Sequence, residues 1–169
     1  IDRGHKIGLV VTAKATPEYQ RTAREFEQLA REQNAHFIYT GNINSAENVA
    51  RLKKLQQMEI ALSVNYSGII AQEVIDLFPL GILNAHGGDL PRYRGNACMA
   101  WAILNRETEV SLCIHKMIGG ELDSGDIIVR RRLRITRDTR VAETFAWMQR
   151  EIPGMMMAAV ELLSENPKA

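Results

Sequence analysis

Asn84 and His86 stand two residues apart at the end of a short apolar segment that begins at Gly81. Because side chains alternate between the two faces of a strand, the amide and the imidazole project the same way and converge on one point. Gly87 and Gly88 follow, which lets the chain turn sharply and lets a ligand approach the backbone. A strand-end Asn and His before a turn are more often structural than catalytic, so this pair alone is weak evidence for a site.

A second polar segment, residues 119–126, is acidic and interrupted by glycines. A neutral histidine is a poor proton donor, so chemistry that develops an oxyanion gains from a carboxylate that keeps the imidazole protonated or passes a proton through water. Asp123 supplies such a carboxylate if this segment folds over His86, which the spacing alone does not show. The alternative is a solvated connection between two strands.

Arginines are concentrated between residues 130 and 140. On a strand, Arg130, Arg132 and Arg134 would line one face, an arrangement that suits phosphate or RNA. A solvated face paired with acids is the more frequent outcome, and the interleaved aromatic residues that stack on bases are absent. The sequence also contains no P-loop, dinucleotide-binding glycine motif, zinc-protease motif or nucleophile elbow.

Short apolar segments alternate with amphipathic ones along the first half of the chain. The expected strands cover residues 7–12, 36–40, 60–64 and 81–84. The expected helices cover residues 16–34, with Thr16 and Pro17 at its start, 45–55, capped by Ser45, and 69–78, ending before Pro79. This alternation predicts an α/β fold with a mainly parallel sheet and helices on both of its faces. Ligands of such sheets bind beyond the carboxyl ends of the strands, where Asn84 and His86 stand.

The second half of the chain is less regular. A helix is expected over residues 96–105, strands over 110–117 and 127–135, and a last helix from Thr139 with a break at Pro153-Gly154. Methionines at helical spacing, such as those at 155–157, are most often core residues. Since no repeat or linker-like segment interrupts the pattern, residues 1–169 are expected to form one domain.

The composition is that of an ordinary globular protein, with 46% hydrophobic and 24% charged residues in a chain of 169. The formal net charge of +1 provides no global attraction to nucleic acid. Cys98 and Cys113 have no partners at zinc-ligand spacing, so neither a metal site nor a disulfide framework is expected, and a reducing, cytoplasmic compartment fits best. The longest apolar stretch, residues 155–160, is far shorter than the ~20 residues that span a bilayer.

Three motifs occur together in a characteristic order. They are Asn84-Ala85-His86, Leu90-Pro91-Arg92-Tyr93-Arg94-Gly95 and Leu122-Asp123-Ser124-Gly125-Asp126-Ile127-Ile128. The set resembles the core of the 10-formyltetrahydrofolate-dependent formyltransferases, and the resemblance extends from about Ile7 to the last helix. It implies a Rossmann-like catalytic domain. Relative to that family, a strand and a helix that would precede Ile1 are absent from this sequence.

The resemblance also implies a catalytic mechanism, because Asn84, His86 and Asp123 match the catalytic triad of the family. A substrate amine would attack the formyl carbonyl, Asn84 and His86 would donate to the developing oxyanion, and Asp123 would orient His86 and help to remove the amine proton. This direct transfer requires no metal. The folate is expected between two loops that contact it largely through backbone groups. The matching residues are Tyr66, Ser67, Gly68, Ile69 and Ile70 in one loop and Ile118, Gly119, Gly120, Glu121 and Leu122 in the other.

The sequence around the first motif indicates the acceptor. Residues 87–89 differ from the Ser-Leu-Leu type run of members that act on initiator tRNA or glycinamide ribonucleotide, and residues 94–98 are similar to members that formylate amino sugars on nucleotide carriers. We therefore expect a nucleotide-linked amino-sugar N-formyltransferase of surface polysaccharide synthesis, such as that of lipopolysaccharide O-antigen. The expected acceptor residues are Arg92, Tyr93, Arg94 and Asn96, whose positive charge suits a diphosphate. A structural role for Arg94, bonding loop carbonyls, is the alternative.

Other functions use the same motifs. A methionyl-tRNA formyltransferase is an alternative, although members of that class carry a C-terminal barrel domain that this sequence lacks. A 10-formyltetrahydrofolate hydrolase would use water as the nucleophile, and a non-catalytic remnant would not bind folate. The expected partners are therefore small molecules, with a possible homodimer and with no membrane or nucleic acid.

Overall fold

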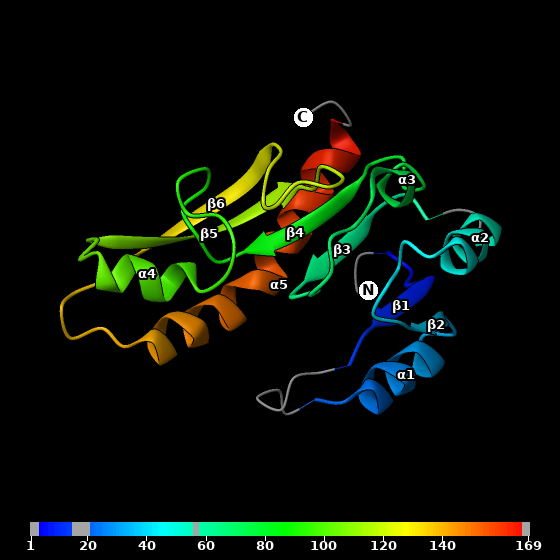
Figure 1. The fold of residues 1–169 in the computed structure, drawn as a ribbon, viewed down its shortest axis with the longest axis horizontal. Coiled ribbons are helices and arrows are strands. Elements are labelled where there is room, and N and C mark those ends of the chain that lie inside the picture. Colours follow the sequence, from blue (N-terminus) through cyan, green and yellow to red (C-terminus); the bar gives the residue numbers. More distant parts are fainter. Residues whose placement is uncertain (1–3, 15–20, 56–57, 167–169) are drawn as a thin grey trace.

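The structure is a computed structural model that describes residues 4–14, 21–55 and 58–166 (Figure 1). Its elements, in chain order, are β1 Leu9–Thr12, α1 Ala23–Glu32, β2 His36–Tyr39, α2 Ala46–Lys54, β3 Ala61–Val64, α3 Gln72–Ile75, β4 Ile82–His86, α4 Cys98–Leu104, β5 Glu109–Lys116, β6 Ile127–Arg134 and α5 Val141–Glu165. All six predicted strands are present. The predicted alternation of strands and helices in the first half is confirmed.

The described strands form two hydrogen-bonded sheets. β1 and β2 pair in parallel, and the second sheet has the order β3-β4-β5-β6. β3 and β4 are also parallel, because α3 returns the chain to the end at which β3 began. β5 runs antiparallel to both β4 and β6. The α/β, Rossmann-like class is therefore confirmed, and an antiparallel hairpin extends its parallel part.

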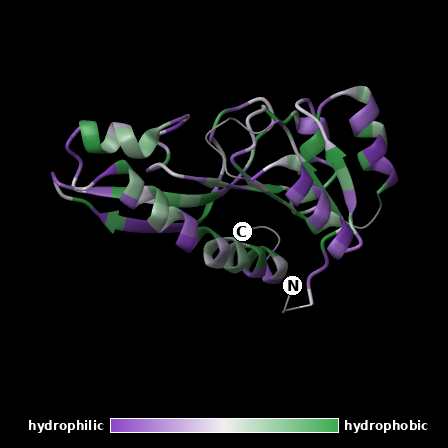
Figure 2. Cartoon of the chain, turned by 90° about the horizontal axis from the view of Figure 1, so that it is seen from below, coloured by the Kyte–Doolittle hydropathy of each residue, from purple (hydrophilic) through white to green (hydrophobic). Residues whose placement is uncertain are grey.

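Two hydrophobic clusters organise the packing. One of them joins the two sheets, since Leu9 of β1 and Ala61 of β3 pack against the same buried side chains, among them Ile38 and Ile82. The other lies between the strands β4 and β5 and the helix α5, which is the most apolar of the three longest helices (Figure 2). Its fully buried members are Leu83, Leu112, Ile114, Met155, Ala159 and Leu163. This second cluster anchors the strand that carries the site.

The helix starts follow local capping chemistry. α1 begins after Thr22, whose backbone N–H donates to the carboxylate of Glu25 at 2.6 Å. The predicted start at Thr16 and Pro17 lies outside the described residues. α2 begins after Ser45, as predicted, and the Ser45 hydroxyl accepts from the backbone N–H of Asn48.

The helix predicted over residues 69–78 is shorter in the structure. α3 covers only residues 72–75, because Asn44 holds the preceding segment in an extended conformation. The Asn44 side chain donates to the carbonyl of Ile69 at 2.7 Å and accepts from the N–H of Ala71 at 2.8 Å. These two bonds leave Ile69 and Ile70 in a loop rather than in a helix.

The predicted break at Pro153-Gly154 is wrong, because α5 continues through both residues. A proline inside a helix removes one N–H donor and frees the carbonyl four residues earlier, here that of Gln149. Both Pro153 and Gln149 are exposed, so water can bond to the freed carbonyl. Despite the length of α5, no helix in the described part of the chain is long and apolar enough to cross a membrane.

Candidate active site

The two faces of β4 have different functions. Leu83 and Ala85 belong to the cluster under α5, so Asn84 and His86 project from the opposite face. The neighbouring strand β5 adds His115 to that polar face, because His115 lies opposite Asn84 in the antiparallel register. An amide and two imidazoles therefore share one surface at the carboxyl end of β4.

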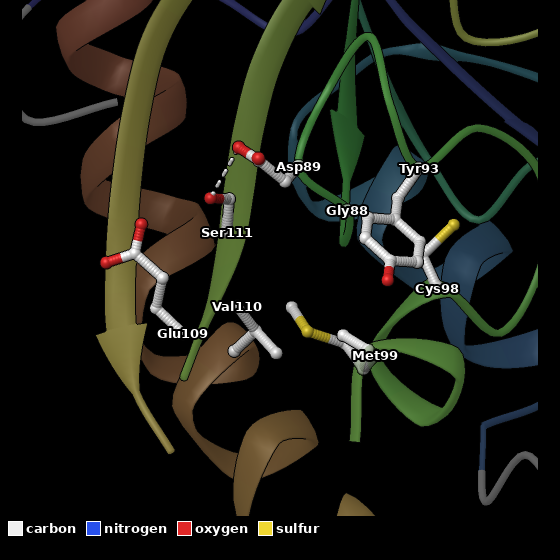
Figure 3. Close-up of a pocket in the computed structure, with 9 residues that line it drawn as sticks. Gly88, Asp89, Tyr93, Cys98, Met99, Glu109, Val110 and Ser111 are labelled. Carbon is white, nitrogen blue, oxygen red and sulfur yellow. Dashed lines mark hydrogen bonds between the residues drawn. The ribbon is translucent and has the colours of Figure 1, made fainter. Parts of the chain in front are cut away.

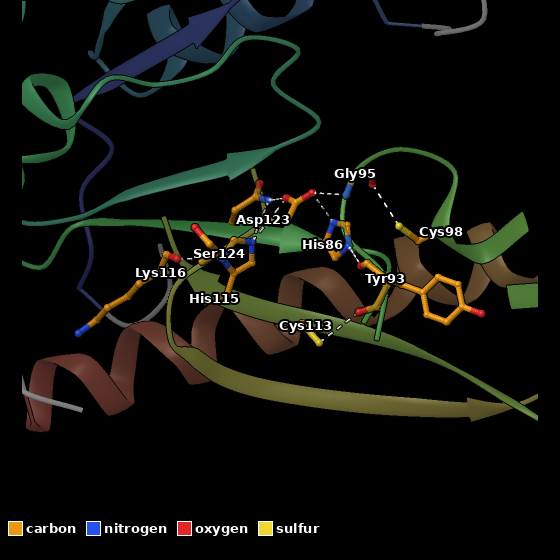
Figure 4. Close-up of polar contacts among 11 residues, drawn as sticks. His86, Tyr93, Gly95, Cys98, Cys113, His115, Lys116, Asp123 and Ser124 are labelled. Carbon is orange, nitrogen blue, oxygen red and sulfur yellow. Dashed lines mark hydrogen bonds and ion pairs between the residues drawn. The ribbon is translucent and has the colours of Figure 1, made fainter. Parts of the chain in front are cut away.

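Asp123 lies at the centre of this polar group (Figure 4). Its carboxylate accepts the backbone N–H of Gly95 at 2.8 Å, and one oxygen lies 3.4 Å from His86 Nδ1. The other oxygen lies 3.4 Å from Asn84 Nδ2 and 3.8 Å from His115 Nε2. The segment before β6 thus folds over the end of β4, and the structure brings the three predicted catalytic residues together.

The imidazole of His86 is held at both of its nitrogens. His86 is 6% exposed, and its Nε2 lies 2.8 Å from the carbonyl oxygen of Tyr93. Since a carbonyl only accepts, Nε2 carries a hydrogen and Nδ1 is the atom that gains or loses a proton beside Asp123. Burial lowers the pKa of His86, while the Tyr93 carbonyl and the charge of Asp123 act in the opposite direction. The balance favours a neutral ring beside a carboxylate.

Gly88 makes the His86–Tyr93 contact possible. A Cβ atom at position 88 would lie 2.4 Å from His86 Nε2, 2.6 Å from the Tyr93 carbonyl oxygen and 2.9 Å from Cys98 Cβ. Such distances are well inside van der Waals contact, so only glycine allows the turn after β4 to pass this close to the histidine. The second glycine after the strand therefore serves the site directly.

His115 is a functional candidate that the sequence analysis missed. The side chain is 1% exposed, and its Nδ1 lies 2.8 Å from the carbonyl oxygen of Lys116 and 3.0 Å from that of Ser124. Its ring meets the His86 ring edge-on, with centroids 6.3 Å apart. In the sequence His115 stands within an otherwise buried apolar strand, and only the register of β5 against β4 could have linked it to Asn84.

The two predicted folate loops lie side by side. The N–H of Gly120 donates to the carbonyl of Ile70 at 3.2 Å, and the N–H of Gly119 donates to the side chain of Gln72 at 2.8 Å. A Cβ atom on Gly119 would lie 2.2 Å from the backbone nitrogen of Gln72, so this approach requires glycine. The hydroxyl of Tyr66 accepts the N–H of Ile43 at 3.2 Å and ties the first loop to the end of β2.

These loops fit a folate in chemical character. Ile69, Ile118 and Leu122 are 58%, 41% and 58% exposed, which provides apolar surface for a flat heterocycle beside backbone polar groups. The hydroxyl of Ser124, next to Asp123, is buried and has no hydrogen-bond partner among the described residues. Within the same residues there is no group of three or more His, Cys, Asp or Glu that could hold a metal ion.

The four predicted acceptor residues divide into two pairs. Arg92 forms an ion pair with Glu107 at 2.9 Å, and the hydroxyl of Tyr93 donates to the same carboxylate at 2.8 Å. The ring of Tyr93 points away from Asp123 (Figure 4). Arg94 and Asn96 are exposed, and neither makes a hydrogen bond or an ion pair within the part of the chain that the structure describes. Among the described residues, Arg94 makes no hydrogen bond to a loop carbonyl, which is the contact that the alternative structural role would require.

The loop after β4 also encloses a small cavity (Figure 3). Its volume is about 10 Å³, which is room for one water molecule and not for a substrate. On its wall, the hydroxyl of Ser111 donates to Asp89 at 3.0 Å. The cavity is therefore not the substrate site, and neither Asn84, His86 nor Asp123 lines it.

The arginines of β6 are largely paired with acids. The ion pairs are Arg130 with Asp89, Arg131 with Glu151, and Arg132 with Glu109. The guanidinium of Arg130 also donates to the carbonyl of Leu90 at 2.6 Å. This finding favours the structural interpretation of the arginine-rich segment over an anion-binding strip.

An α/β sheet that holds an amide, an imidazole and a carboxylate at a strand end, beside two adjoining loops, has the groups that acid–base chemistry on a bound substrate requires. The family model described as formyl transferase matches residues 2–160. The chain therefore belongs to the formyl transferase family, whose members are one-carbon group transferases.

Three solved structures with the same fold are distant from this chain in sequence. Phosphoribosylglycinamide formyltransferase from Bacillus halodurans matches with a TM-score of 0.77 and 18% identity, over 95% of this chain and 82% of that one. The formyltransferase PseJ from Anoxybacillus kamchatkensis, in complex with UDP-4,6-dideoxy-4-formamido-L-AltNAc and tetrahydrofolate, matches with a TM-score of 0.62 and 18% identity. The match covers 95% of this chain and 78% of that one. HypX from Aquifex aeolicus, in complex with tetrahydrofolic acid, matches with a TM-score of 0.67 and 18% identity, over 96% of this chain and 27% of that one.

Proposed function

We propose that residues 1–169 form a catalytic domain that transfers the formyl group of 10-formyltetrahydrofolate to the amine of a nucleotide-linked amino sugar. The observation that carries the proposal is the cluster of Asn84, His86 and Asp123 within 3.4 Å contacts at the end of β4. The bound ligands named for PseJ, a formamido sugar nucleotide and tetrahydrofolate, support the same chemistry. Synthesis of a surface polysaccharide is the expected role of such a product.

In the proposed reaction the amine nitrogen forms a bond to the formyl carbon, and the bond from that carbon to the folate nitrogen breaks. Asn84 stabilises the oxygen while it carries negative charge, and His86 adds a second donor once its Nδ1 has accepted a proton, because its Nε2–H is bonded to the Tyr93 carbonyl. The ammonium proton passes to the pair formed by His86 Nδ1 and Asp123, which lie 3.4 Å apart. The same pair returns a proton to the departing folate nitrogen, so the site ends the cycle in its original state.

The donor is proposed to bind at the two adjacent loops, residues 66–70 and 118–122. Their exposed apolar side chains, Ile69, Ile118 and Leu122, would contact the faces of the pterin, and backbone groups would bond to its edge. When bound, the folate supplies the formyl group. Because Gly119 and Gly120 connect the second loop to the first, both loops would respond together to a bound folate.

For the acceptor we propose that Arg94 and Asn96 contact the nucleotide diphosphate. Both are exposed beside Gly95, whose N–H donates to Asp123, so their backbone lies next to the catalytic carboxylate. Arginine suits a diphosphate because its guanidinium forms paired hydrogen bonds with phosphate oxygens. Arg92 and Tyr93, which are bonded to Glu107, are proposed to hold the shape of this loop at the acceptor site.

The deciding experiment follows tetrahydrofolate production with a panel of acceptors. The panel contains nucleotide-linked 4-amino-4-deoxy sugars, glycinamide ribonucleotide, charged initiator tRNA, and buffer without an amine. Formylation of the sugars alone supports the proposal, and formylation of another acceptor alone overturns the sugar assignment. Steady formate release without an amine would instead indicate a hydrolase. The His86→Ala variant is the negative control for each arm.

Two further expectations follow from the sequence and stay predictions. A cytoplasmic location is expected, and Cys98 and Cys113 are both unpaired and buried in the structure. We also propose a homodimer as one candidate assembly, which light scattering of the purified protein would test.

A further inference from the structure

The tautomer of His115 follows from its surroundings. Nδ1 faces two carbonyl oxygens, those of Lys116 at 2.8 Å and Ser124 at 3.0 Å. Carbonyl oxygens only accept, so Nδ1 carries a hydrogen in either charge state of the ring. In the neutral ring Nε2 is therefore an acceptor, and it faces Asn84.

This acceptor determines how the amide of Asn84 lies. The oxygen and nitrogen of a carboxamide have nearly the same shape, so hydrogen-bond partners decide which end points where. Nδ2 of Asn84 lies 3.2 Å from His115 Nε2, and a bond there commits one of its two hydrogens. The second hydrogen faces Asp123 across 3.4 Å, which is long for a hydrogen bond. This N–H can therefore donate to a different acceptor instead of Asp123.

The surroundings of His115 leave it few other partners. The titratable groups that face it are Asp123, from the loop before β6, and His86 on β4. α5 packs on the opposite face of β5, against apolar side chains. Gly125 brings the loop close to the first of the two carbonyls, because a Cβ atom there would lie 2.3 Å from the Lys116 oxygen.

We propose that His115 is a positioning residue: two backbone carbonyls set its tautomer, and its Nε2 then holds the Asn84 amide so that the second N–H, which faces Asp123 in the structure, is available to donate to the formyl oxygen. This role rests on the proposed function. With Nε2 absent, the amide would be free to turn its oxygen toward the developing oxyanion, which would oppose the reaction. His115 itself touches no substrate in this scheme and acts through Asn84.

A double-mutant cycle tests the proposal, with His115→Phe, Asn84→Ala and the double variant. His115→Phe keeps a planar aromatic ring, although a larger one than imidazole, and removes both nitrogens. We expect kcat to fall by about 10- to 100-fold, as for other small misplacements of catalytic groups, with KM for the folate changed by less than about three-fold. In the Asn84→Ala background the same change should lower kcat by less than about two-fold, because its route of action is already lost. Full multiplicative losses, or no loss in the single variant, overturn the proposal.

A second variant and a control make the outcome independent of folding defects. His115→Gln places an amide oxygen near the position of Nε2, so it should retain more of the wild-type kcat than His115→Phe. Ser111→Ala, on the same buried face of β5, is the matched control and should leave kcat within about two-fold. Equal losses in His115→Gln and His115→Phe, when both are folded by circular dichroism, contradict the positioning role.

An NMR measurement needs no substrate and so separates this proposal from the proposed function. The side-chain NH₂ signals of Asn84 are assigned by their loss in Asn84→Ala. In the wild type the two protons should be inequivalent and slow to exchange. In His115→Phe their shifts should change and exchange should accelerate, and His115→Gln should lie between His115→Phe and the wild type. Unchanged signals in His115→Phe overturn the positioning role. If no acceptor is formylated by the wild type, the function fails while this measurement still decides the role of His115.

Discussion

Replacement of Gly88 by alanine should damage the site from outside the catalytic triad. The added Cβ would lie 2.4 Å from His86 Nε2, and because ordinary contact begins at 3.4 Å the ring would have to retreat by about 1 Å. The Tyr93 carbonyl, at 2.6 Å, would have to move as well, so the 2.8 Å bond between the two would be lost or lengthened. Overpacking of this kind destabilises by about 1–3 kcal/mol, and a 1 Å displacement of a catalytic group lowers turnover by about 100-fold.

Urea unfolding of Gly88→Ala measures the first effect, and tetrahydrofolate production with an acceptor that the panel above shows to be formylated measures the second. Gly154→Ala is the matched control, because nothing lies within 4 Å of its Cβ position and alanine is the better helix former, so it should stabilise α5 by about 0.5–1 kcal/mol. If Gly88→Ala has wild-type stability and turnover, the tight passage of the chain past His86 is not what holds the ring.

Three more outcomes are expected. Asn84→Ala and His86→Ala should each lower kcat by about 100- to 1,000-fold with folate-analogue affinity within a few-fold, and near-normal turnover would place oxyanion stabilisation elsewhere. Burial holds the pKa of His86 below its usual 6.5, so the folded protein favours the neutral ring. The contribution of this ring to the free energy of unfolding is complete above pH 6.5 and is lost as the pH falls through the lowered pKa. Asp123→Asn should lower that pKa further in an NMR titration, because the charge of Asp123 raises it, and an unchanged or raised value would contradict this. Gly119→Ala should abolish folate-analogue binding in calorimetry, because its Cβ would lie 2.2 Å from the backbone of Gln72, and retained affinity would argue against the two-loop site.

The sequence predicted the strands and the convergence of Asn84 and His86 because both depend on local patterns, the run of apolar residues and the two-residue period of a strand. The meeting of Asp123 with His86 could be anticipated only by resemblance to a family. It depends on how a loop about forty residues away folds back, which no local pattern encodes. The same holds for the adjacency of the two loops at Gly119 and Ile70.

Other features were beyond the reach of sequence patterns. His115 joins the site through an antiparallel register, and a histidine in an apolar strand carries no sign of its partner. The continuity of α5 through Pro153 depends on that residue facing solvent, which periodicity around a proline does not reveal. Arg92 and Tyr93 were assigned to an acceptor site by chemistry alone, while their pairing with Glu107 required the actual path of the loop.

The two-sided use of β4 makes the site unusually sensitive to changes of chain length. Alternate residues of this strand serve the α5 cluster and the polar group around Asp123, so an inserted or deleted residue within it would send Asn84 and His86 into the apolar interior and Leu83 toward the crevice. A substitution in β4 would change one side chain and so reduce activity or stability only partly. A shift of one residue would instead move every side chain of the strand to the opposite face. Directed evolution of this enzyme can therefore vary β4 only in its side chains.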